Sequence, residues 1–148
     1  MGLEHRFSSA EIGFVIHATE NSERILDSIE STLSVPKTNF SLSEAEGHFK
    51  NQIRLASCNL ASGDANEFAT RVISLLRSSD KEELSRNLSQ HSDERGNLYI
   101  RIDKQALCKG RVILSESDSI RIRFKPVRRF KPSGNLESYR GLLSSTIE

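Results

Sequence analysis

The chain has little of several residue types on which common protein classes depend. Its 148 residues include no tryptophan, two cysteines and only 6% aromatic residues. Cys58 and Cys108 lie far apart, with no CxxC pair or Cys/His cluster around either, so neither a zinc site nor a disulfide framework is indicated. We expect both to be plain thiols of the core or of loops, and we predict neither a metal nor a cofactor.

Long apolar runs are missing as well. No stretch approaches the roughly 18 consecutive apolar residues that a membrane-spanning helix needs. Residues 1–9 contain His5 and Arg6, but no apolar segment of the secretory type follows them. The sequence therefore predicts a cytoplasmic protein that does not enter a membrane.

The common catalytic signatures are also absent. The chain has no HExxH, GxSxG, P-loop or GxGxxG string. His48 and Asn51 are the one polar pair that resembles a site, and Glu44 or Glu46 would have to act with His48 in a hydrolase. We interpret His17 and His91 as structural histidines and predict that the protein is not an enzyme.

The length suits a single hydrophobic core and is too short for two independent domains. We predict one domain over residues 1–131. Residues 132–148 are rich in serine and glycine with scattered leucines, which is typical of a loosely ordered tail.

Hydrophobic spacing predicts the elements of the first half. A short β-branched run at 12–18 indicates a buried strand, and Asn21 or Ser22 can cap a helix that ends before Pro36. Strands at 39–45 and 53–60 would form a hairpin across the turn-forming residues between them. Asp64 is expected to cap a second helix.

A third helix and a change of period follow. The string S-x-x-E at 79–82 predicts a capping box at the start of the third helix. Beyond the turn at 93–96 the period falls to two, which predicts strands around 98–103 and 120–125, with a further strand at 111–115. This order does not alternate strand with helix, so it favours an α+β fold with an antiparallel or mixed sheet and helices on one face.

The net charge of +1 hides an uneven distribution. Residues 1–100 hold 10 Lys/Arg against 15 Asp/Glu, whereas residues 101–131 hold 10 against 3. Such a concentration of cations favours binding to a polyanion, because clustered Lys and Arg raise the local potential and displace counterions from phosphates.

The period-two pattern gives these cations a direction. If the apolar residues of the two strands face the helices, then the opposite face of the sheet carries Tyr99, Arg101, Arg121, Arg123 and Lys125. Three further groups extend the predicted RNA-binding set. They are Arg128 and Arg129 downstream, the loop residues Lys104, Gln105 and Lys109 with the adjoining Arg111, and His48, Lys50 and Asn51 of the hairpin loop.

Three strings resemble an archaeal family of small RNA-binding proteins described as predicted exosome subunits. They are VIHATE at 15–20, GHFKNQI at 47–53, and LYIRIDKQA at 98–106 followed by Gly110. The resemblance implies a fold similar to the large-subunit ribosomal protein that holds 5S ribosomal RNA, a tendency to dimerise, RNA binding and no catalytic centre. It also implies that the 47–49 loop and the group Arg101, Lys104 and Gln105 belong to the site. Lys50 and Gln52 depart from the family pattern of the loop.

The sequence leaves two main hypotheses and one minor one. The first is a non-catalytic protein that grips structured RNA, with Tyr99 stacking on an unpaired base. This hypothesis includes a role as an accessory of an RNA-processing or exosome assembly and the formation of a homodimer. The second is an adaptor that docks its basic face on an acidic protein partner. The third, minor hypothesis is a hydrolase in which His48 acts with Glu44 or Glu46.

Overall fold

The computed structural model describes residues 6–46, 51–127 and 139–143. Five antiparallel strands form one sheet in the order β2-β3-β1-β5-β4. In chain order the strands are β1 (Phe7–His17), β2 (Ser41–Glu46), β3 (Gln52–Ala61), β4 (Leu98–Asp103) and β5 (Ser119–Pro126). The predicted α+β class is confirmed, and the sheet is antiparallel throughout rather than mixed.

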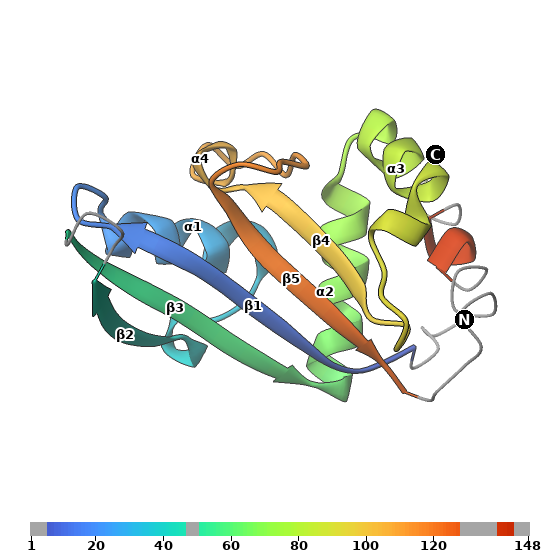
Figure 1. Ribbon diagram of the computed structural model, residues 1–148, viewed down its shortest axis with the longest axis horizontal. Helices are drawn as coiled ribbons and strands as arrows, with labels where there is room; N and C mark the ends of the chain where they lie inside the picture. Colours follow the sequence, from blue (N-terminus) through green and yellow to red (C-terminus); the bar gives the residue numbers. More distant parts are fainter. Residues whose placement is uncertain (1–5, 47–50, 128–138, 144–148) are drawn as a thin grey trace.

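Helices cover one face of this sheet and leave the other open. The two long ones, α1 (Ser22–Leu33) and α2 (Ser62–Leu75), lie behind the sheet in Figure 1. The shorter elements are α3 (Ser78–Arg86), α4 (Lys104–Leu107) and the 3-10 turns η1 (Lys37–Asn39) and η2 (Leu88–Gln90). In the described part of the chain, no helix has the length and apolar character needed to span a membrane.

Strict alternation of side chains creates this difference between the faces. In β1 the residues Ala10, Ile12, Phe14 and Ile16 are buried beneath the helices, and the residues between them point to the open face. The same holds for the two strands at the basic end of the sheet. Their predicted inward residues Leu98, Ile100, Ile102, Ile120, Ile122 and Phe124 are all at most 2% exposed.

The helix starts agree with the sequence in one case and differ in two. Asn21 caps α1 by accepting a hydrogen bond from the backbone N–H of Arg24 (3.2 Å), as predicted. Asp64 is not a cap, because α2 follows β3 without a loop and Asp64 falls in its first turn. The predicted capping box is also wrong. Helix α3 begins at Ser78 with Arg77, not Ser79, at its N-cap position, and Asp80 accepts hydrogen bonds from Arg77 and from the backbone N–H of Leu114 (3.1 Å).

The predicted strand at 111–115 does not form. Only isolated bridges occur there, from Val112 to Leu76 and from Leu114 to Ile102. The backbone N–H of Ser115 also donates to the carbonyl of Arg101 (2.9 Å). This segment therefore lies along the outer edge of β4 and occupies part of it, because Asp80 and the end of α2 hold it there.

Residues 139–143 include a short helical segment that packs into the core. The ring of Tyr139 stacks on Phe7 at a centroid distance of 5.7 Å, and its hydroxyl donates to the carbonyl of Gly96. Leu142 and Leu143 are buried beside it. The neighbouring residues of the predicted tail lie outside the described residues, and the domain boundary at 131 stays a prediction.

Candidate nucleic-acid interface

The open face of the sheet presents the predicted basic residues on two adjacent strands. Arg101 of β4 lies directly opposite Arg121 of β5, and Tyr99 lies directly opposite Arg123. Lys125 follows on β5 and is exposed. The sequence-predicted sheet set is therefore brought together on one surface, as the alternation required.

Arg101 and Arg121 form an unusual pair. Both side chains are exposed, and no carboxylate within residues 6–46, 51–127 and 139–143 makes an ion pair with either of them. Like charges directly opposite each other across two strands destabilise a sheet. The pair is thus a place where an external anion would relieve repulsion.

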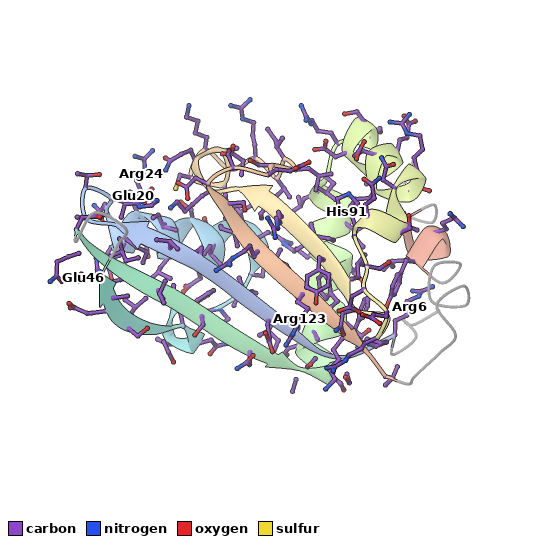
Figure 2. All side chains as sticks on the ribbon, viewed as in Figure 1. Arg6, Glu20, Arg24, Glu46, His91 and Arg123 are labelled. Carbon is purple, nitrogen blue, oxygen red and sulfur yellow. The ribbon has the colours of Figure 1, made fainter. Side chains whose placement is uncertain are left out.

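Arg123 differs because the protein supplies its countercharge. Its guanidinium bonds to the carboxylate of Glu11, which lies opposite it on β1. Partial burial disfavours the charged form, but the hydrogen bond and charge of Glu11, with the Tyr99 phenol, outweigh burial and raise the pKa of Arg123. Figure 2 labels Arg123 on the open face. This arginine is therefore fixed in place and partly neutralised.

Tyr99 is also held in place. Its hydroxyl donates to the carboxylate of Asp93 (2.8 Å), which also accepts from the side chain of Asn97 (3.0 Å) and its backbone N–H (2.9 Å). Burial disfavours the charged carboxylate, yet these bonds prevail and lower the pKa of Asp93. The ring is half-buried at the margin of the basic surface with its polar end already bonded.

A hollow of about 470 Å³ lies between the basic strands and the centre of the sheet. Gly13 of β1 and the exposed Ser57 and Asn59 of β3 line its far side. Its near side is lined by Tyr99, Arg101, Arg121 and Arg123, and Glu11 lies between the two sides. We call this surface the arginine hollow.

The position of Lys104 differs from the sequence prediction, which placed this residue in the RNA-binding set. Its side chain is 0% exposed, and its ammonium donates to the carbonyl of Val15 (2.6 Å) and to Glu20 (2.8 Å) and lies 3.1 Å from Asp118. Both anionic partners come from outside the predicted RNA-binding set. A fully buried and fully paired ammonium cannot clamp a phosphate at the surface, so Lys104 is a structural residue.

We call Lys104, Glu20, Asp118, His17 and Gln105 the buried-lysine cluster. Gln105 donates to the second carboxylate oxygen of Glu20 (2.8 Å), so the strings VIHATE and DKQA meet here. Ligand atoms of His17, Glu20 and Asp118 lie within 4.8 Å of one another, but both carboxylates already hold the lysine ammonium. The cluster therefore supplies its own cation.

Three predicted residues of the described ranges lie away from the hollow. Lys109 and Arg111 are exposed on the turn after α4, and Asn51 is exposed just before β3. None of the three lines the hollow. His48, Lys50, Arg128 and Arg129 lie outside the described residues.

Sequence reasoning missed the far side of the hollow. Glu11, Gly13, Ser57 and Asn59 are uncharged or acidic, so a search for cations passes over them. The alternation of Ala10, Ile12, Phe14 and Ile16 was the available signal, because it places the residues between them on the open face. Pairing of β1 with both β3 and β5 then completes the surface.

An antiparallel sheet with one helix-covered face and one basic open face defines a small α+β protein with a surface suited to a polyanion. A family model described as RNA binding matches residues 9–126, and the chain belongs to this family. RNA-binding protein PAB1135 of Pyrococcus abyssi is 34% identical to it over 116 residues, which cover 74% of this chain and 75% of that protein.

Solved structures agree with the fold. The crystal structure of protein SSO0741 from Sulfolobus solfataricus has a TM-score of 0.77 and 27% identity, covering 94% of this chain and 99% of that one. Protein AF2318 from Archaeoglobus fulgidus has a TM-score of 0.78 and 27% identity, covering 93% and 99%. Both are DUF54 proteins.

Proposed function

We propose that this protein is a non-catalytic RNA-binding protein that contacts its RNA through the arginine hollow. The observation that carries the proposal is the Arg101–Arg121 pair, two exposed cations placed opposite each other without a carboxylate partner in the described residues. A phosphate between them would replace repulsion with two charge-assisted hydrogen bonds. The family description as RNA binding and the name of the Pyrococcus relative support RNA over other polyanions.

The surface favours structured RNA recognised mainly through its backbone. Arginine contacts to phosphates position a protein on RNA without reading sequence. The arginine hollow offers one aromatic ring, that of the half-buried Tyr99, on which a base could stack. A long single strand would need several such rings, so recognition by shape is expected. A role as an accessory of an RNA-processing or exosome assembly is part of this proposal and follows from the sequence resemblance.

Charge reversal of the arginine pair tests the proposal. We expect Arg101→Glu with Arg121→Glu to weaken binding to a structured RNA on the order of a hundredfold. This corresponds to a loss of about 1.4 kcal/mol of binding free energy, or one tenfold change in affinity, for each arginine. The slope of log affinity against log salt should also fall by about 2, because about one unit is lost per phosphate contact. Filter binding or fluorescence anisotropy over a salt series measures both.

The matched control is Arg24→Glu with Arg86→Glu, which makes the same change of charge on exposed helix residues away from the hollow. It should leave affinity within a few-fold of the parent. Unchanged binding by the Arg101/Arg121 variant would remove the hollow as the RNA site. Negligible affinity of the parent for any RNA would instead favour an acidic protein partner.

A further inference from the structure

Gly13 occupies a position where the fold itself does not require glycine. It lies in the middle of β1, the central strand, where it pairs with Arg121 on one side and Ser57 on the other. Its φ is not among the positive values found at Gly96 and Gly110, so backbone conformation does not demand a glycine. The register of β1 with β5 shifts between Phe7 and Ser9, not at Gly13.

Internal packing does not demand glycine either. A Cβ built on Gly13 would meet only the carbonyl oxygen of Ala56, at 3.7 Å, which is ordinary van der Waals contact. Glycine weakens a strand interior and often marks a place where a ligand or another backbone approaches closely. With bulges, conformation and internal crowding set aside, close approach from outside is the remaining reason.

The row of residues across Gly13 matches the chemistry of a nucleotide. Reading across adjacent strands, it runs Arg101, Arg121, Gly13, Ser57 and Ser41. Strands lie about 4.8 Å apart, so Arg121 and Ser57 are separated by about 10 Å, close to the reach of one nucleotide from phosphate to base edge. The two arginines lie at one end of this row and the two serines at the other. Gly13, which has no side chain, lies between them.

We infer that the arginine hollow seats one unpaired nucleotide of the RNA, with its phosphate at Arg101 and Arg121 and its ribose against the backbone of Gly13. The base then reaches Ser57 and Asn59, whose hydroxyl and amide offer both donors and acceptors to a base edge. A base held in a helix cannot enter, because its edge is occupied by its partner. This inference rests on the proposed function and adds to it the kind of nucleotide that the surface takes.

Filling the hollow tests the seat directly. Gly13→Val adds a side chain that suits a strand and projects from the open face, and Gly13→Ala makes a smaller step in the same direction. We expect Gly13→Val to weaken binding of a hairpin RNA with an unpaired loop at least tenfold, and Gly13→Ala to weaken it less. Binding of a blunt duplex without unpaired nucleotides should stay unchanged. Ser43→Val, on the same face but outside the hollow, should change neither affinity.

Two further readouts separate the possible failures. The melting temperature of both Gly13 variants should equal or exceed that of the parent, and if Gly13→Val does not fold, Gly13→Ala carries the test. Fluorescence of 2-aminopurine placed in the loop should change on binding to the parent and not to Gly13→Val.

Tight hairpin binding by Gly13→Val, with binding lost in the Arg101/Arg121 variant, would overturn the seat and leave the RNA surface standing. An equal loss for hairpin and duplex would overturn the preference for an unpaired nucleotide. A parent that binds neither RNA would overturn the proposed function and the seat together.

Discussion

Arg101 and Lys104 are separated by two residues, yet the fold gives them opposite surroundings. Arg101 is exposed on the open face opposite a second arginine. Lys104 is completely buried and contacts two carboxylates and a backbone carbonyl. The number of internal anions, rather than the density of cations along the sequence, decides which positive charge is available to an external partner.

The difference has an energetic side. A buried ammonium must be compensated within the fold, and breaking such a pair leaves an uncompensated charge at a cost of about 3–5 kcal/mol. An exposed arginine opposite another arginine contributes little to stability or lowers it. Stability should therefore depend on the buried-lysine cluster, and RNA affinity on the arginine hollow.

The largest expected effect is on stability at Lys104. Lys104→Met keeps a long side chain but removes the cation that Glu20 and Asp118 share. We therefore expect the free energy of unfolding to fall by about 3 kcal/mol. The lower end of that range applies because Asp118 is 44% exposed and can recover solvent. Urea unfolding followed by circular dichroism measures the change.

Arg101→Met is the matched control for this comparison. It removes a positive charge with the same replacement and should leave stability within about 0.5 kcal/mol of the parent, as surface substitutions usually do. RNA affinity should fall in Arg101→Met. A stable Lys104→Met protein beside a destabilised Arg101→Met protein would reverse the assignment of the two cations.

This pair of residues also shows how far the sequence reaches. Period-two alternation predicted that Arg101, Arg121 and Arg123 share a face, because side-chain direction in a strand is a local property. It did not predict that Glu20, 84 positions away from Lys104, would meet its ammonium. Such pairing depends on tertiary structure, which brings the turn after β1 and the residue before β5 to the start of α4.

The arginine hollow likewise depends on tertiary structure that local sequence patterns do not predict. Gly13 lies beside Arg121, and Ser57 beside Gly13, only because of the strand order, which the sequence did not specify. The strand predicted at 111–115 failed for a similar reason. Its backbone makes only isolated bridges, from Val112 to Leu76 and from Leu114 to Ile102, and Asp80 accepts a hydrogen bond from the backbone N–H of Leu114.

A smaller effect is expected from acid on the buried-lysine cluster. Burial disfavours the charged form of Glu20, but hydrogen bonds from the His17 backbone and from Lys104, with the charge of Lys104, lower its pKa below the ordinary 4.5. A carboxyl with a lowered folded pKa stabilises the fold above its unfolded pKa, and this contribution is lost as pH falls through the folded value. Glu20→Gln should therefore destabilise near pH 6.

That difference between Glu20→Gln and the parent should shrink as pH falls below 4.5, which unfolding curves at several pH values can measure. Asp93 also has a lowered pKa, so the comparison must be between parent and variant at each pH. Glu82→Gln, on the exposed face of α3, serves as control and should show no such convergence. If the difference in unfolding free energy between the parent and Glu20→Gln stays constant across the pH range, the charge of Glu20 does not contribute to the stability of the cluster.

The smallest expected effect concerns the arginine that the fold has half neutralised. Glu11→Gln removes the countercharge of Arg123 while keeping the size of the side chain, so Arg123 should become available to phosphate. Since exposed ion pairs are worth about 0.2–1 kcal/mol, RNA affinity should rise no more than about fivefold. The gain should fade at high salt, where exposed charges are screened. Glu67→Gln makes the same charge change on α2, on the helix side, and should raise affinity less. Lower affinity in Glu11→Gln would instead make Glu11 a contact of the RNA.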